Sequence, residues 1–359
     1  MNKIFWVSFW EKILDPQESG FLIGISRIFL GFCAQFYGGI IRVRNGAYDL
    51  NIFSTHRVSV PVISIGNISM GGTGKTSLTV WCAHFFLQNR KKPVIISRGY
   101  GRAKGSPPIQ VMTGSSIPHV NIVGDEPSMM FNALKQVPII VGADRVLCAK
   151  RAVQEFAPDV ILLDDGFQHR RLFRNLDIVN IDDTFLEISN IFPRGVLREG
   201  WDSLKRAHFI VVKTQNSNSL FIEQQVRQFN LNLEMAFFHY QAESVVHSLD
   251  KKIEELQFLH QARLIVVSAI ANPKSFEKIL KDLGAEIVMS KHSPDHYFFT
   301  VEDLNSLKES AVQMNAQIIT TEKDAVRIPP HFDFLILKVK LEWRSGESEL
   351  SKKLLSCVQ

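Results

Sequence analysis

Cysteine is scarce in this chain, and the spacing that binds zinc is missing. The four cysteines lie far apart, and no two of them form a CxxC pair: Cys33, Cys82, Cys148 and Cys357. A disulfide framework and a zinc knuckle are therefore both unexpected, and the sequence favours a reducing compartment. The stretch Met1–Trp10 also lacks the small-residue cleavage pattern of a secretory signal.

A strong excess of charge of one sign is absent as well. Lysine and arginine number 41 against 36 acidic residues, which gives a net charge of +5. This mild excess fits an anionic ligand or a membrane surface, and we expect no nucleic-acid partner. With 45% hydrophobic and 21% charged residues, a disordered chain is excluded, and the length of 359 residues predicts two domains.

An apolar segment near the N-terminus predicts a membrane-associated helix. The segment Phe21–Ile41 would be ~30 Å long as a helix, about the thickness of one hydrocarbon core. Its small and polar residues share one narrow face, a pattern typical of a helix that lies in the interface or packs on protein. These residues are Gly20, Gly24, Arg27, Gly31, Gln35 and Gly38. Arg42, Arg44 and Arg57 follow, and we expect them to face an anionic cytoplasmic leaflet.

From Pro61 onward, short apolar runs alternate with segments of helical length. Such alternation predicts an α/β fold in which helices cover both faces of a parallel sheet. The predicted strands are Val62–Ile65, Val94–Ser97, Val137–Val141, Val160–Leu163, Asp177–Ile181 and Phe209–Val212, followed by Leu264–Ser268 and Gln317–Thr320. Predicted helices include Thr76–Gln88, Arg145–Phe156 and Phe221–Asn232.

A polar stretch at Asn216–Ser219 suggests a domain boundary. We therefore expect an N-terminal membrane-associated segment over residues 1–57, a phosphate-binding domain over 58–215 and a smaller α/β domain over 216–359.

The strongest single signal is a glycine-rich loop between a strand and a helix. It follows Val62–Ile65 and reads Ser69-Met70-Gly71-Gly72-Thr73-Gly74-Lys75-Thr76. Glycines let successive backbone N–H groups face a phosphate, and the helix N-terminus adds its dipole. We expect Lys75 to reach the β- and γ-phosphates and the Thr76 hydroxyl to bind Mg²⁺. Ser69 stands where the usual GxxxxGK[ST] pattern has its first glycine.

Two adjacent acids end another apolar strand. Val160–Leu163 runs directly into Asp164 and Asp165. The carboxyl ends of parallel strands are where ligands bind in open α/β sheets, and paired carboxylates there repel each other unless a cation is present. Asp164 and Asp165 are therefore the predicted carboxylate ligands of the metal.

Three classes of phosphate-loop protein compete at this point. A GTPase would carry an NKxD-type motif, and the sequence has none. A partitioning-type membrane ATPase also has GGxGKT, but its signature lysine lies just before the double glycine, where this chain has Met70. A small-molecule kinase requires an acceptor hydroxyl and a base that takes its proton.

Seven short strings together resemble the tetraacyldisaccharide 4'-kinase family, the lipid A 4'-kinases. They run in the family's order from Pro61–Thr76 through Ser97–Arg102 (SRGYGR), Gly124–Pro127 (GDEP), Leu163–Arg170 (LDDGFQHR), Gly195–Glu199 (GVLRE) and Pro294–Phe299 (PDHYFF) to Thr320–Arg327 (TTEKDAVR). Two positions depart from the pattern. Ser77 replaces the usual proline, and the AGIGNP string reads AIANP over Ala269–Pro273.

The resemblance implies roles for residues that spacing alone does not identify. It implies that Asp125 is the catalytic base and that His296 pairs with it. It also implies that Arg198 contributes to catalysis at the phosphates and that Arg170 binds phosphate. Glu199 and Gln168 would support the metal or its waters. The role of the Thr321–Asp324 part of TTEKDAVR stays open.

The resemblance further implies the reaction. It is transfer of the γ-phosphate of ATP, with Mg²⁺, to the 4'-hydroxyl of an acylated glucosamine disaccharide 1-phosphate in lipid A biosynthesis. Because the acyl chains of such a substrate stay in the bilayer, we expect the enzyme at the cytoplasmic face of the inner membrane, with the Phe21–Ile41 helix docked at headgroup level.

Overall fold

The computed structural model describes most of the chain and divides it into two compact units. The described residues are 13–14, 18–114, 118–183, 190–214, 219–295, 297–329 and 331–358. One unit combines Met1–Ile96, Asp144–His239 and Trp343–Gln359, and the other combines Ser97–Ala143 with Tyr240–Glu342. Each unit is thus assembled from separate stretches of sequence. The domains predicted from the sequence, 1–57, 58–215 and 216–359, are each one continuous stretch.

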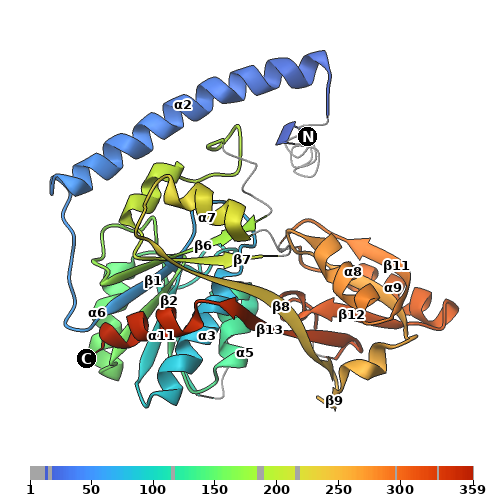
Figure 1. Ribbon diagram of the computed structural model, residues 1–359. Coiled ribbons are helices and arrows are strands. Elements are labelled where there is room, and N and C mark those ends of the chain that lie inside the picture. Colours follow the sequence, from blue (N-terminus) through green and yellow to red (C-terminus); the bar gives the residue numbers. More distant parts are fainter. Residues whose placement is uncertain are drawn as a thin grey trace. The chain divides into compact units, whose positions relative to one another are not determined.

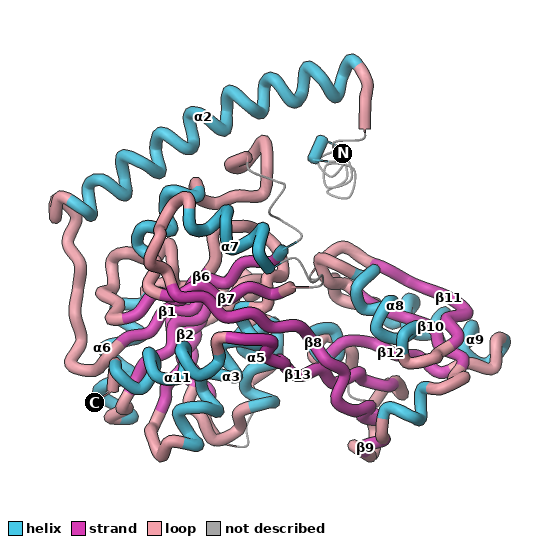
Figure 2. Tube along the Cα trace, in the orientation of Figure 1, coloured by secondary structure: helices cyan, strands magenta, loops and turns pink. Residues whose placement is uncertain are grey.

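The first unit is built on a parallel sheet (Figure 2). Its order is β8-β7-β6-β1-β5-β2, and every neighbouring pair is parallel. The strands are β1 (Val62–Gly66), β2 (Pro93–Ser97), β5 (Val160–Asp164), β6 (Leu176–Asp182), β7 (Phe209–Lys213) and β8 (Glu234–His247), the last of which continues into the second unit. The predicted parallel sheet is confirmed.

Helices cover both faces of this sheet (Figure 1). They are α3 (Lys75–Gln88), α6 (Arg145–Phe156), α7 (Ser219–Arg227), the 3₁₀ helix η2 (Trp201–Arg206) and α11 (Glu347–Ser356). Helix α7 packs Ile222 and Val226 into a cluster with Val179 of β6 and Val212 of β7. The C-terminal segment from Trp343 onward belongs to this unit, and Trp343 contacts the ring of Trp81 on α3, with centroids 4.9 Å apart.

The N-terminal helix α2 (Phe21–Asp49) is longer than predicted, with 29 residues. It is the one helix among the described residues that is long and apolar enough to cross a membrane. Only Ala34 and Gly38 are buried, and a Cβ at Gly38 would lie 3.3 Å from Ile191. A Cβ at Gly24 or Gly31 would meet nothing within 4 Å. The predicted small-residue face therefore packs on protein near Gly38 but not at Gly24 or Gly31.

In the second unit, parallel strands lie in the order β11-β10-β12-β13. Its strands are β10 (Arg263–Ser268), β11 (Glu286–His292), β12 (Gln317–Thr321) and β13 (Leu335–Ser345), with helices α8 (Pro273–Asp282), α9 (Val301–Gln313) and α10 (Glu322–Ala325) and the 3₁₀ helix η3 (Leu256–Leu259). Strand β9 (Ile253–Glu254) pairs antiparallel with β8. The Ser97–Ala143 stretch adds the antiparallel pair β3 (Ile109–Met112) and β4 (Ile139–Gly142) and the helices α4 (Val120–Val123) and α5 (Asp125–Ala133).

Candidate active site

The glycine-rich loop forms the expected strand–loop–helix turn. Strand β1 ends at Gly66, and α3 begins at Lys75 with Gly74 as its N-cap in the left-handed conformation (φ 91°). Gly71 also has a positive φ, of 101°. An L side chain rarely adopts such angles, so glycine is what lets the loop curl ahead of the helix N-terminus. A glycine-rich loop that curls ahead of a helix N-terminus has the backbone form of a phosphate-binding loop.

Two buried asparagines form hydrogen bonds with Thr73 of this loop. The Asn67 side-chain amide donates to the Thr73 hydroxyl (3.1 Å), and the Asn180 amide of β6 donates to the Thr73 carbonyl (2.9 Å). All three residues are fully buried. The sequence motifs gave no role to Asn67 or Asn180. For Asn180, the one hint in the sequence was an amide within the otherwise mostly apolar strand Asp177–Ile181.

The segment Val196–Glu199 lies alongside the loop and contains two predicted site residues, Arg198 and Glu199. The Met70 N–H donates to the Val196 carbonyl (2.7 Å), and the Arg198 N–H donates to the Ile68 carbonyl (2.7 Å). Ser69 forms an isolated antiparallel bridge with Leu197. These backbone bonds bring Arg198 and Glu199 next to the phosphate loop, although more than a hundred residues separate them in sequence.

An ion cluster of three residues lies at the start of α3. Asp165 accepts from Arg198 Nη1 at 2.9 and 2.8 Å, and its Oδ1 is 3.7 Å from Lys75 Nζ. Burial by itself would raise the pKa of Asp165, but the charges of Lys75 and Arg198 outweigh it and hold that pKa below its usual range. Asp165 is therefore an ionised carboxylate beside the lysine predicted to bind phosphate.

The remaining predicted metal-site residues line the same edge. Asp164 ends β5 opposite Ile65 of β1 and is 1% exposed, and Thr76 is the second residue of α3. Gln168 donates its side-chain amide to the Asn67 carbonyl (2.8 Å). Glu199 is 1% exposed and accepts from Arg206 (2.8 Å), while its Oε1 has no hydrogen-bond partner within the described part of the chain.

This donor set fits a hard divalent cation. No group of three or more His, Cys, Asp or Glu side chains is gathered for a metal among the described residues. Mg²⁺ does not require such a group, because it usually binds one or two carboxylates together with substrate phosphates and waters. Hydroxyl and carboxylate oxygens beside a phosphate cradle meet that requirement.

The C-terminal end of α2 reaches this site directly. Arg44 donates to the Gln168 carbonyl (2.5 Å), and the Asn45 amide donates to Glu199 (2.9 Å). Arg170 donates to the Asn45 carbonyl (2.9 Å) and pairs with Asp49 (2.6 Å). The last turns of the apolar helix thus bind residues of the LDDGFQHR and GVLRE strings, a link that the sequence did not predict.

Two of the arginines expected at the leaflet, Arg44 and Arg57, also contact other parts of the protein. Arg44 binds the Gln168 carbonyl, as described, and the guanidinium of Arg57 lies 3.4 Å from the ring centroid of Phe173. Arg170, expected to bind phosphate, also contacts Asn45 and Asp49 of α2.

In the second unit, Asp125 occupies the first turn of α5 and is 4% exposed. Its Oδ1 accepts from the Glu126 N–H (3.0 Å), and its Oδ2 lies 3.8 Å from Arg327 Nε. His296 lies outside the described residues, so the expected pairing of Asp125 with His296 stays a prediction.

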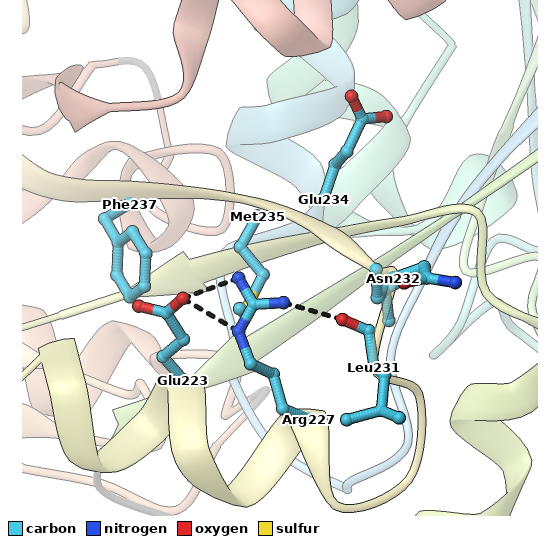
Figure 3. Close-up of a pocket in the computed structure, with 8 residues that line it drawn as sticks. Glu223, Arg227, Leu231, Asn232, Glu234, Met235 and Phe237 are labelled. Atoms are coloured by element: carbon cyan, nitrogen blue, oxygen red, sulfur yellow. Dashed lines mark hydrogen bonds and ion pairs between the residues drawn. The ribbon is translucent and has the colours of Figure 1, made fainter.

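A pocket of about 390 Å³ lies elsewhere in the first unit, between α7 and the start of β8 (Figure 3). Arg227 within it donates twice to Glu223 (2.8 and 2.6 Å) and once to the Leu231 carbonyl (2.7 Å). The pocket lies at the amino-terminal ends of the strands, because it includes the start of β8, and β8 is parallel to β7, β6 and β1. The phosphate loop follows the carboxyl end of β1, at the opposite end of the strands. The pocket is not part of the phosphate site.

The chain is similar to known proteins over most of its length. The family model described as tetraacyldisaccharide-1-P 4'-kinase matches residues 26–359. A tetraacyldisaccharide 4'-kinase of Bdellovibrio bacteriovorus is 33% identical over 313 residues, covering 86% of this chain and 91% of that protein. One of Chlorobium phaeobacteroides is 34% identical over 352 residues, covering 90% and 95%.

A solved structure is similar over nearly the whole chain. It is the "apo" form of LpxK from Aquifex aeolicus in complex with ATP, with a TM-score of 0.76 and 28% identity, covering 93% of this chain and 99% of that one. Fold, phosphate loop and relatives agree, and the chain belongs to the tetraacyldisaccharide-1-P 4'-kinase family.

Proposed function

We propose that this chain transfers the γ-phosphate of ATP to the 4'-hydroxyl of an acylated glucosamine disaccharide 1-phosphate. The observation that carries the proposal is the phosphate loop with Lys75, Asp165 and Arg198 gathered at its helix end, in a chain of this kinase family. The partitioning-type ATPase remains the rival class, and Met70 in place of its signature lysine argues against it.

The loop residues Ser69–Thr76 would hold the triphosphate through backbone N–H groups. Lys75 is only loosely paired with Asp165, at 3.7 Å, so phosphate oxygens can replace this carboxylate as its partner. Arg198 forms the tighter pair with Asp165 and lies on the segment bonded to the loop. Both cations would then stabilise negative charge that develops as the phosphoryl group leaves ATP.

Thr76, Asp164 and Asp165 would hold Mg²⁺, with Glu199 and Gln168 supporting it or its waters. When bound, the ion supplies neutralisation of charge on the β- and γ-phosphate oxygens. Glu199 suits a supporting role because its buried Oε1 faces no donor in the described part of the chain, while Arg206 and Asn45 fix its Oε2.

Asp125 would accept the proton of the attacking hydroxyl, with His296 as its partner. A carboxylate held at the start of a helix, with a backbone N–H on one oxygen and a guanidinium near the other, is a fixed base. A nearby imidazole would orient it and share the proton as the alkoxide forms.

Helix α2 would dock the enzyme on the cytoplasmic face of the inner membrane. Its exposed apolar side chains include Phe21, Leu22, Ile25, Ile28, Phe29, Phe32, Phe36, Ile40 and Val43. Burying such a surface in a lipid interface is favourable by roughly 25 cal/mol per Å². Since the end of this helix binds Gln168 and Glu199, docking would also bring the phosphate loop to the headgroup level.

The site assignment is tested with the full chain, Mg²⁺, ATP and the acylated disaccharide 1-phosphate. Lys75→Ala and Asp125→Asn should each remove most turnover, because one loses a charge at the phosphates and the other loses the base. Lys92→Ala, an exposed lysine of the same unit, serves as the control and should be unaffected. Near-normal turnover of Asp125→Asn would refute the base assignment. ATP hydrolysis and ATP-dependent dimerisation without any lipid would support the rival class.

Membrane docking is tested by co-sedimentation with anionic vesicles. Phe29→Ser and Phe32→Ser together should reduce the bound fraction, because both side chains are more than half exposed on α2. Leu231→Ser, which removes an apolar side chain that is 75% exposed elsewhere in the unit, is the matched control. Equal losses in both variants would refute a specific role of the α2 surface.

A further inference from the structure

The TTEKDAVR string has a definite geometry in the second unit. Strand β12 ends at Thr321, which caps α10 by accepting from the Asp324 N–H (3.1 Å). The chain then turns, and Arg327 points back into the unit with its side chain fully buried (0% exposed). Two members of the string, Asp324 and Arg327, are thus buried and charged.

The Arg327 guanidinium joins four segments of the second unit. Nη2 donates to Asp324 Oδ1 (2.6 Å) and to the Ala269 carbonyl (3.3 Å), and Nη1 donates to the Tyr297 carbonyl (3.2 Å). Its Nε lies 3.8 Å from Asp125 Oδ2. One side chain therefore contacts the GDEP string, the AIANP string, the PDHYFF string and its own TTEKDAVR string.

The chemistry of arginine suits this position. A guanidinium stays charged under all conditions that a protein meets, and its planar fork serves several acceptors at once. Asp324 supplies the counter-charge at hydrogen-bond distance. Burial raises the pKa of Asp324, and the charge of Arg327 opposes this rise. The pair therefore holds the Arg327 guanidinium in a fixed, buried position beside Asp125.

We infer that Arg327 is a positioning residue for Asp125, and that this is the function of the TTEKDAVR string. The inference rests on the proposed role of Asp125 as the base. At 3.8 Å the two groups attract each other without a direct hydrogen bond between Nε and Oδ2. The charge favours an ionised, oriented carboxylate, and the bond to the Tyr297 carbonyl fixes the residue that follows His296.

The test is a double-mutant cycle in the full-length enzyme, with kcat and the Kd for ATP measured separately. Arg327→Met should lower kcat by about 100-fold, the scale of general-base catalysis, while the Kd for ATP stays within about twofold. Arg327→Lys keeps the charge and should restore part of kcat. Lys338→Met is the control, since it breaks an ion pair with Glu322 of α10, the helix that also carries Asp324, and should leave kcat unchanged.

The second arm separates this inference from the base assignment. In an Asp125→Asn background, Arg327→Met should cost almost nothing further in kcat, because the two residues act as one unit. Full additivity of the two losses would overturn the inference, as would a normal kcat for Arg327→Met when Asp125→Asn is inactive. If Asp125→Asn itself is active, the base assignment fails instead. Should Arg327→Met not fold, the same cycle with Arg327→Lys decides, with additivity again as the refuting result.

Discussion

The buried amide of Asn180 gives the sharpest test of how the phosphate loop is held. Its Nδ2 donates to the Thr73 carbonyl at 2.9 Å, and both residues are fully buried. Asn180→Leu keeps the approximate volume but leaves this carbonyl without its donor. A buried unsatisfied acceptor costs about 1–3 kcal/mol. At about 2–4 °C per kcal/mol for a domain of this size, the melting temperature should fall by about 2–12 °C.

The same change should weaken ATP binding, because a loosened Thr73 no longer fixes the N–H groups that face the phosphates. A loss of 1–2 kcal/mol would raise the Kd by about 5- to 30-fold. Calorimetric titration with ATP and a thermal scan measure the two effects. Asn89→Ala is the matched control, because the Asn89 amide makes the same kind of bond to the Phe85 carbonyl but is exposed. An unchanged Kd in Asn180→Leu, or an equal effect in both variants, would refute the reasoning.

Two further predictions concern packing and pH. Gly66→Ala would place a Cβ 2.5 Å from the Phe167 Cβ, so we expect a cost of about 1–3 kcal/mol and lower turnover, and an unaltered thermal scan would contradict this. The hydrogen bond from Lys291, followed by those from the α9 cap, holds the pKa of Asp303 well below its usual range. Its contribution to stability is therefore present above about pH 4 and is lost as the pH falls through the depressed pKa. In denaturant titrations, Asp303→Asn should be less stable than wild type at pH 7 and should approach it in acid, whereas a constant gap would speak against this linkage.

The sequence predicted the elements whose signal is local. Fully apolar strands such as Val160–Leu163 can be recognised from their composition. The helix Arg145–Phe156 was predicted with the bounds that the structure shows. Strands β11 and β13 were not predicted because most of their residues are only partly buried, so they lack a continuous apolar run. The long strand β8 was missed for the same reason, since burial is interrupted along it.

Contacts between distant segments could not be predicted from the sequence. Arg198 and Glu199 were singled out by resemblance, but their backbone pairing with the phosphate loop depends on the fold. The amides of Asn45 and Asn180 belong to no recognisable string, and their partners lie far away in sequence. The assembly of each unit from separated stretches has the same origin, because compactness depends on which segments touch and not on their order.

One measurement tests the central claim most directly. The full-length protein is incubated with Mg²⁺, ATP labelled at the γ-phosphate and the acylated glucosamine disaccharide 1-phosphate, and the labelled lipid is analysed by NMR for the site of the new ester. The account predicts a label on the 4'-oxygen that depends on Lys75. Label released only as inorganic phosphate, at the same rate with and without the lipid, would contradict it.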